Sequence, residues 1–326
     1  MSTEAPSPLS RLDYTGDIVP LVGEICDAYG IGEPLNSSVI EVGYEDCNVI
    51  IETEQGRYLA KMFAKTRAQS EINRYADTIR HVVEAGVNHP APVLTPDGAF
   101  MHRIGNVSLA LMRYVEGKTF YGMGRLPTDE ERRAIVEQAA KINQIDYRPP
   151  YLFDTWAIPH IGQMFKRVRQ FIAPEDLELV EWALREYYAI PIDTLPRSFV
   201  HGDIIKTNTI KGDDDKLYII DFSVANWYPR IQELAVMAAN LLHEEGGAGL
   251  AERCEVLVRD YEQFSPLTDP ERRHLYAYAL AGIAMEFMGS HQEKYINGYD
   301  TDETNYWLQL GRQGLRRELS TKGASS

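Results

Sequence analysis

The residues best suited to chemistry in this 326-residue sequence lie in two neighbouring segments, VHGDIIKTNTI and LYIIDFS. Asp203, Asn208 and Asp221 follow one another at spacings of five and thirteen residues. Extended runs on either side of an Asp-rich turn predict a hairpin with strands at 209–211 and 217–220. Because the open ends of antiparallel strands lie side by side, the hairpin predicts that Asn208 and Asp221 are neighbours.

These side chains suit a divalent cation and a proton acceptor. Mg²⁺ prefers oxygen ligands and takes only one or two carboxylates from a protein, with water and nucleotide phosphates as the rest. We therefore predict Asn208 and Asp221 as metal ligands. Asp203 is the predicted catalytic base, which accepts the proton of an attacking hydroxyl group and aligns its oxygen with a γ-phosphate. The chemistry predicted from these residues is phosphoryl transfer to an alcohol.

The elements that precede this segment predict a small sheet and a helix. Three extended runs between Val39 and Phe63, with a turn at Gly56, are typical of an antiparallel sheet. Apolar residues at 3.6-residue spacing over 66–85, followed by Gly86, predict one helix packed on that sheet. The apolar run at 107–114 predicts a further strand that leads into a connection between two lobes.

The pattern then becomes helical. Thr128 and Glu131 form a capping box that opens a helix toward Gln144, and a second helix begins at Pro174. The predicted fold class is α+β, a bilobal fold with an antiparallel sheet and one packed helix in the N-lobe and a mainly helical C-lobe. The predicted divisions are a disordered tail at 1–15, the N-lobe at 16–112, a hinge at 113–117, the C-lobe at 118–319 and a disordered tail at 320–326.

Composition limits the partners. The chain has 48 acidic and 33 basic residues and a net charge of −15, which argues against nucleic acid as a partner. Its three cysteines form no Cys-x-x-Cys pair, which favours a reducing compartment and a cytoplasmic location. We expect no membrane-spanning segment, because the most apolar stretch, 275–288, is short and contains Glu286.

The motif His201-Gly202-Asp203-x-x-x-x-Asn208, followed by Ile220-Asp221-Phe222, resembles the pattern of the aminoglycoside phosphotransferase family of small-molecule kinases. The chain is nearest in character to homoserine kinase-like members. The resemblance implies the protein-kinase fold, Mg²⁺, and ATP or GTP as phosphoryl donor. Within it, Lys61 resembles the lysine that holds the α- and β-phosphates, and Glu71 resembles the glutamate that orients that lysine.

The resemblance also implies binding residues. LMRYVEG at 111–117 is similar to the family's hinge, so backbone groups from Met112 to Tyr114 are expected to meet the purine. EVGYEDCN, with Gly43 and Tyr44, is expected to cover the phosphates, although it holds a single glycine. Further candidates for binding the acceptor are Glu233, which stands where relatives have aspartate, Trp227 and Tyr228. Other acidic residues of the C-lobe could bind an acceptor amine but are expected to face solvent, namely Glu244, Glu245, Glu286 and Asp300.

Several alternatives stay open at this point. A protein kinase on the same scaffold is disfavoured, because Phe222-Ser223 replaces Phe-Gly and residues 230–242 read as a helix instead of a long activation segment. A catalytically silent nucleotide-binding protein is a second alternative. The sequence does not choose between ATP and GTP, or among amino acids, amino alcohols, aminoglycoside-like sugars and nucleosides as the acceptor.

Overall fold

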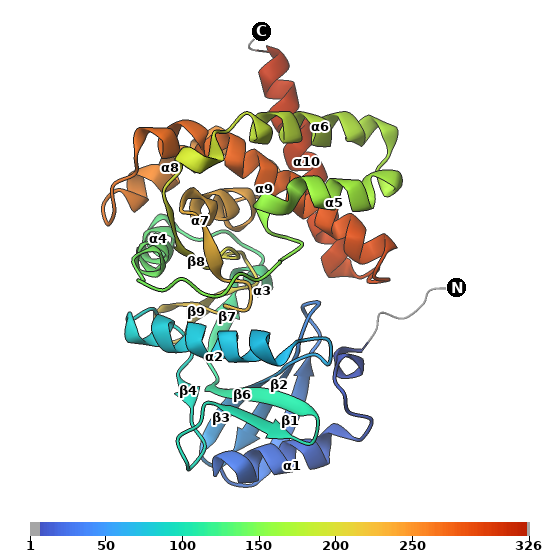
Figure 1. Cartoon of the computed structure of the whole chain (residues 1–326), viewed down its shortest axis with the longest axis vertical. Helices are drawn as coiled ribbons and strands as arrows, with labels where there is room; N and C mark the ends of the chain where they lie inside the picture. The colour runs from blue at the N-terminus through green and yellow to red at the C-terminus, as the bar shows by residue number, and fades with distance from the viewer. Residues whose placement is uncertain (1–6, 325–326) are drawn as a thin grey trace.

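The N-terminal lobe is built on an antiparallel sheet. The computed structural model describes residues 7–324, and its sheet has the order β1-β2-β3-β6-β4, with β5 also paired to β6 (Figure 1). Side chains of β2 alternate between buried and half-buried, as expected of a strand with one face on a core. The strands are β1 (Pro34–Ile40), β2 (Cys47–Thr53), β3 (Gly56–Met62), β4 (Pro92–Val93), β5 (Met101–Ile104) and β6 (Val107–Arg113).

Two helices cover this sheet, where the sequence predicted one. The expected helix is α2 (Gln69–Glu84), which packs toward the C-lobe. The additional helix is α1 (Ile18–Tyr29), whose apolar side chains join the other face of the sheet in a separate core (Figure 1). Its ends carry ordinary signals, since Asp17 accepts a hydrogen bond from Val19 N and Gly30 adopts a left-handed φ of 63°.

The expected disordered tails are wrong where the structure describes them. Pro8–Arg11 form a short 3₁₀ helix, and Leu12 after it is buried in the N-lobe core. At the other end, residues 320–324 continue the last helix, α10. The remainder of the two predicted tails, 1–6 and 325–326, lies outside the described residues.

The C-lobe is mostly helical, as predicted, and α9 crosses its centre (Figure 1). The predicted capping box at Thr128 is present with both hydrogen bonds, and it opens α4. The helices are α3 (Phe120–Met123), α4 (Asp129–Asn143), α5 (Ile161–Val168), α6 (Pro174–Tyr188), α7 (Ile231–Val236), which continues as a π-helical turn over Met237–Leu241, α8 (Leu250–Tyr261), α9 (Asp269–Tyr295) and α10 (Asp302–Ala324). Within residues 7–324, no helix is long and apolar enough to cross a bilayer.

Two small sheets carry the catalytic segments. The predicted hairpin is confirmed as β9 (Thr209–Gly212) paired with β10 (Leu217–Ile219), and β7 (Gly117–Thr119) extends this sheet. β8 (Arg197–Val200) pairs with β11 (Asn226–Pro229). β7 begins directly after the segment that leaves β6, so the connection between the lobes ends beside the hairpin (Figure 1).

Candidate active site

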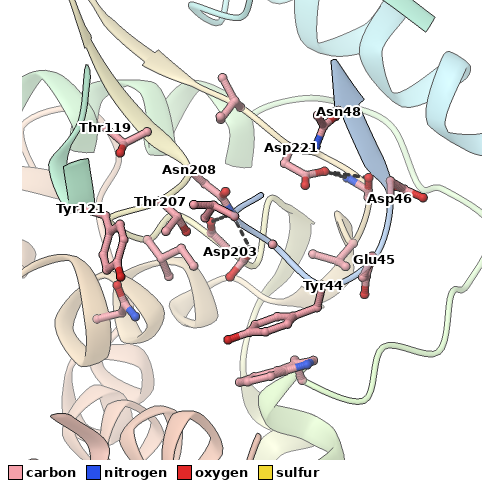
Figure 2. Close-up of a pocket in the computed structure, with 18 of the residues that line it drawn as sticks. Tyr44, Glu45, Asp46, Asn48, Thr119, Tyr121, Asp203, Thr207, Asn208 and Asp221 are labelled. Atoms are coloured by element: carbon pink, nitrogen blue, oxygen red, sulfur yellow. Dashed lines mark hydrogen bonds between the residues drawn. The ribbon is translucent and has the colours of Figure 1, made fainter. Parts of the chain in front are cut away.

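A cavity of about 1090 Å³ lies between the lobes and is lined by residues from both. Its size fits a nucleotide together with a small second ligand. Asp203, Asn208 and Asp221 all line it, and Figure 2 shows Asp203 and Asn208 next to each other. Most of the residues predicted from sequence line it, namely Gly43, Tyr44, Lys61, Met112, Tyr114, Asp203, Asn208 and Asp221.

The hairpin register brings the two predicted metal ligands together. Thr209 pairs with Ile219, and Ile220 N donates to Asn208 O at 3.0 Å, so Asn208 and Asp221 flank the last paired positions. Asn208 Nδ2 donates to Asp203 Oδ2 at 2.7 Å (Figure 2). This hydrogen bond turns the amide nitrogen toward Asp203 and leaves the amide oxygen as a ligand atom.

Asp221 has an unusual backbone for a residue with a side chain. Its φ is 63°, and within residues 7–324 only Asp215, in the hairpin turn, is another non-glycine residue with positive φ. Such conformations cost free energy and are concentrated at functional sites. Asp221 Oδ1 accepts hydrogen bonds from Lys61 Nζ at 3.1 Å and from the Ser223 hydroxyl at 2.7 Å. Burial opposes ionisation of Asp221, but Lys61 and Ser223 outweigh it and hold its pKa below the usual range.

Lys61 lies in β3, only 4% exposed, between two carboxylates. Its Nζ is 3.1 Å from Asp221 Oδ1 and 3.1 Å from Asp46 Oδ2 (Figure 2). Although burial lowers the pKa of Lys61, the charges of Asp221 and Asp46 raise it above its ordinary value. Lys61 is therefore a fixed cation that faces the cavity.

The predicted role of Glu71 is wrong. Its carboxylate accepts a hydrogen bond from Ala68 N at 3.1 Å, at the start of α2, and it makes no ion pair with Lys61. Asp46 pairs with Lys61 instead, and it is itself held by Ala64 N at 3.0 Å and by the Arg67 guanidinium. The reason is the register of α2, in which Glu71 is the third residue and its side chain is used for capping.

Asp203 is held by its own loop. Its backbone N donates to His201 Nδ1 at 3.0 Å, and His201 Nε2 donates to Ile220 O at 3.0 Å, on the metal-ligand segment. Burial lowers the pKa of His201 to about 4, so the ring is neutral with the proton on Nε2. Burial, together with the Asp154 and Asp221 carboxylates, raises the pKa of Asp203 well above its usual range.

Glu233 holds the backbone of the loop that carries Asp203 and does not line the cavity. It is fully buried, and it accepts hydrogen bonds from His201 N at 2.7 Å, Gly202 N at 3.0 Å and Asn143 Nδ2 at 3.3 Å. Its predicted contact with the acceptor is therefore wrong, and Glu233 acts on the site through the position of the loop. Burial raises its pKa to about 7.

The prediction that Trp227 and Tyr228 bind the acceptor is also wrong. They lie in β11, where Trp227 pairs with Phe199 and Tyr228 pairs with Ser198, and neither lines the cavity. Tyr228 is buried and its hydroxyl accepts a hydrogen bond from Asn226. Both residues therefore belong to the strand pair and not to the described lining of the cavity.

The connection between the lobes and the loop at 41–46 border the cavity as expected, with one difference. Met112 and Tyr114 line it, but Tyr114 N already donates to Arg57 O at 3.0 Å. The Tyr44 side chain extends toward the C-lobe, where its hydroxyl lies 3.0 Å from the Thr304 hydroxyl and its ring stacks on Trp156 (Figure 2). Tyr44 therefore borders the C-lobe part of the cavity.

The sequence did not locate that part of the cavity, and the expectation that Glu286 faces solvent is wrong, because this side chain lines the cavity and is only 8% exposed. The walls of that part of the cavity come from the segment 154–156, one face of α9 and the beginning of α10. Burial and Glu45 raise the pKa of Asp154, in this wall, to about 7. On α9, the cavity residues are at 282, 285, 286, 292 and 293, which lie toward one side of the helix.

The residues present fit a divalent cation. Asp221 Oδ2 and Asn208 Oδ1 supply one carboxylate and one amide oxygen at neighbouring positions, which is the donor set that Mg²⁺ takes beside phosphate oxygens. Lys61 lies on the Oδ1 side of Asp221, so a cation on the other oxygen would be separated from it.

A two-lobed fold with a strand lysine, a hairpin metal site and a loop aspartate in the cleft defines a kinase-like phosphotransferase. Residues 37–274 match the model of the Phosphotransferase enzyme family, APH. The match covers most of the chain, which therefore belongs to this family and is a small-molecule kinase that acts on hydroxyl groups.

Its relatives agree with this assignment. A homoserine kinase of Parvibaculum lavamentivorans is 24% identical over 80% of this chain and 81% of its own. A homoserine kinase of Hyphomonas neptunium is 26% identical over 79% of this chain and 81% of its own. The solved structure of an amicoumacin kinase, 14% identical, covers 95% of both chains with a TM-score of 0.68 and confirms the fold.

Proposed function

We propose that the protein transfers the γ-phosphoryl group of ATP or GTP to a hydroxyl group of a small amine-bearing molecule, with Mg²⁺ bound to Asn208 and Asp221. The observation that supports this most is the convergence of Lys61, Asp221, Asn208 and Asp203 on one cavity from separate parts of the chain. A binding scaffold without catalysis has no use for an aspartate held beside a metal site.

Each residue has a separate task in this proposal. Lys61 binds the α- and β-phosphates, and Asp46 keeps its ammonium group in place when phosphate arrives. Asp203 accepts the proton of the acceptor hydroxyl and orients its oxygen, with Asn208 holding the carboxylate. When bound, Mg²⁺ neutralises charge on the β- and γ-phosphates. Positioning and charge neutralisation supply most of the rate enhancement.

The first prediction concerns Asp203. In Asp203→Asn, kcat falls by about 10²–10⁴-fold, the range typical of a lost general base, because the amide cannot accept the hydroxyl proton. The affinity for Mg²⁺-nucleotide changes little. ADP or GDP release measured with a panel of hydroxylated amines, amino acids and sugars checks this, with nucleotide binding followed by thermal shift. Asp213→Asn, an exposed aspartate in the turn of the same hairpin, is the matched control.

The second prediction concerns Asp221. Asp221→Asn tolerates the same backbone conformation but removes the charge, so we expect metal-dependent nucleotide affinity to fall by at least about tenfold. Nucleotide titrations with Mg²⁺ and with EDTA measure this. Equal metal dependence in the variant and the parent would remove Asp221 from the metal site, and nucleotide binding with no transfer to any acceptor would favour the silent alternative.

A further inference from the structure

The cavity continues beyond Asp203 to a region enclosed by α9, α10 and the segment 154–156, which we name the acceptor end. Its α9 wall includes Glu286, Gln292 and Glu293, and its other walls include Asp154, Trp156 and Tyr44. Tyr44 and Trp156 stack with their ring centroids 6.3 Å apart and 10° between their planes. The acceptor end is therefore a region of carboxylates and aromatic rings.

Two hydrogen-bond acceptors in this wall have no partner. Glu286 is 8% exposed and Gln292 is 4% exposed, and both line the cavity. The Oε1 atom of each side chain is buried and makes no hydrogen bond to the described part of the chain. Glu286 Oε2 accepts one from Asn240 Nδ2 at 3.2 Å, so Glu286 is anchored with its second oxygen unpaired. Buried polar atoms left without a partner are costly, which points to a ligand that donates to them.

The ionised form of Glu286 is also only partly stabilised by its surroundings. Burial raises its pKa to about 8, although Lys206 and Arg253 oppose the rise. Lys206 Nζ donates to the His243 carbonyl and, at 3.0 Å, to the Tyr306 hydroxyl, so two of its three hydrogen atoms are used by groups other than Glu286. A cation that enters from the cavity would complete the pairing of Glu286.

A ligand carboxylate has no comparable partner here. Among the described residues that line the cavity, the lysines and arginines are Lys61, Arg113 and Lys118. Lys61 is held between two carboxylates, while Arg113 at the end of β6 and Lys118 in β7 belong to the connection between the lobes. A carboxylate in the acceptor end would lie beside Glu286, Glu293 and Asp154, with no lysine or arginine among the described lining residues of that region to pair with it, which is costly.

We propose that the acceptor end binds the ammonium group of a hydroxylated amine that carries no carboxylate, with Glu286 Oε1 as its principal partner, while Gln292 Oε1 is placed to accept a hydrogen bond from another donor of a larger ligand. This inference rests on the proposed function, since it assigns the substrate class of the same site. The aromatic rings of Tyr44 and Trp156 add cation–π attraction and exclude water. The acceptor is thus an amino alcohol or amino sugar in its chemistry, and it differs from an amino acid such as homoserine.

Three small probes separate these possibilities. L-Homoserine carries both charged groups, 3-aminopropan-1-ol keeps only its amine, and 4-hydroxybutanoate keeps only its carboxylate. Calorimetric titrations into the full chain with Mg²⁺ and a non-hydrolysable ATP analogue should show 3-aminopropan-1-ol binding most tightly. We expect it to bind at least about tenfold more tightly than 4-hydroxybutanoate, with homoserine between the two.

Glu286→Gln tests the named partner with little change of shape. It should weaken 3-aminopropan-1-ol by at least about tenfold, leave 4-hydroxybutanoate unchanged or slightly improved, and leave nucleotide affinity unchanged. Glu255→Gln, on the exposed face of α8, is the matched control and should behave as the parent.

The results decide the two proposals separately. Equal binding of the three probes, tightest binding of 4-hydroxybutanoate, no amine binding, or no effect of Glu286→Gln would each overturn the inference. Nucleotide turnover is followed in parallel with the same probes. Turnover with 4-hydroxybutanoate as good as with the amine would keep the kinase and reject the amine site. Amine binding that depends on Glu286 without any turnover would do the reverse.

Discussion

The carboxylate of Asp221 belongs both to the ion pair with Lys61 and to the predicted metal site. Asp221 serves as a predicted ligand through one oxygen while its other oxygen lies 3.1 Å from Lys61 Nζ. Asp46, whose side chain is almost completely buried, pairs with Lys61 and Arg67 and is not one of the predicted metal ligands. Asp46 therefore keeps the lysine placed regardless of what Asp221 binds.

This assignment separates Asp46 from Glu71 in a third prediction. Asp46→Asn leaves Lys61 and Arg67 partly unpaired in a buried setting, so we expect the free energy of unfolding to fall by about 3–5 kcal/mol and the KM for nucleotide to rise by about tenfold or more. Glu71→Gln alters only the helix cap, with a loss of about 1 kcal/mol or less and an unchanged KM for nucleotide. Urea unfolding and nucleotide titrations measure both variants. A larger effect of Glu71→Gln on KM would restore the glutamate to the orienting role.

Individual residues were placed correctly from the sequence where local structure, such as a hairpin or a strand, determines their positions. Asn208 and Asp221 were placed together correctly because they close one hairpin, and Lys61 was placed correctly because its strand is read from local pattern. Asp46 was missed because its contact with Lys61 is made by a loop and depends on how α2 begins. Glu233 was assigned from its place in a motif, and only its burial showed that it holds the loop.

At the scale of elements, α2 is tied to the segment that follows the predicted metal aspartate. Arg74 on α2 is buried and donates to three backbone carbonyls, those of Pro150 at 2.8 Å, Ser223 at 3.2 Å and Ala225. One side chain of the N-lobe therefore fixes two segments of the C-lobe. The lobe-to-lobe arrangement around Asp221 depends on this helix.

Arg74 gives a fourth prediction. Arg74→Met keeps much of the volume but leaves buried carbonyls without donors, at a cost of about 1–3 kcal/mol each where water does not replace the guanidinium. We expect lower stability together with a kcat reduced by about tenfold, since Asp221 is no longer held in register. Arg80→Met, on the exposed side of α2, is the control. Steady-state kinetics of both variants, beside urea unfolding, separate positioning from simple loss of folded protein.

The elements themselves were predicted unevenly. Strands and helices with clear period or capping signals, such as β2 and α4, were found. The helix α1 was missed although Asp17 and Gly30 mark its ends. The helix α9 is buried along most of its length, so it has little polar-to-apolar alternation for the sequence to reveal, and the acceptor end that it forms stayed hidden.

The whole molecule holds several histidines neutral in its interior. Burial lowers the pKa of His89 to about 4, of His201 to about 4 and of His243 to about 3. Between these values and about 6.5 the unfolded chain binds protons that the folded chain does not, so each histidine lowers stability as the pH falls through that window. Buried carboxyl groups such as Glu286, with raised pKa, act in the opposite direction.

The fifth prediction concerns the pH-dependent contribution of one of these histidines, His243. Between pH 7 and pH 5, His243 lowers the free energy of unfolding by about 2 kcal/mol, and His243→Gln removes this contribution. The variant should therefore lose about 2 kcal/mol less than the parent over the same change of pH, whatever its stability at pH 7. Denaturant unfolding at both pH values measures it. His102→Gln, at a half-buried site, is the control, and parallel pH profiles for all three proteins would contradict the prediction.

The left-handed backbone of Asp221 has a consequence for the tolerance of this position to mutation. Its φ of 63° favours glycine, asparagine and aspartate, whereas its metal role requires a carboxylate. A saturation library at this codon should therefore separate into tiers. Aspartate alone retains turnover, asparagine and glycine retain normal folded yield without turnover, and β-branched residues lose yield as well. Glutamate, the usual conservative exchange for aspartate, falls in the lower tiers because it meets the demand on charge but not the demand on the backbone.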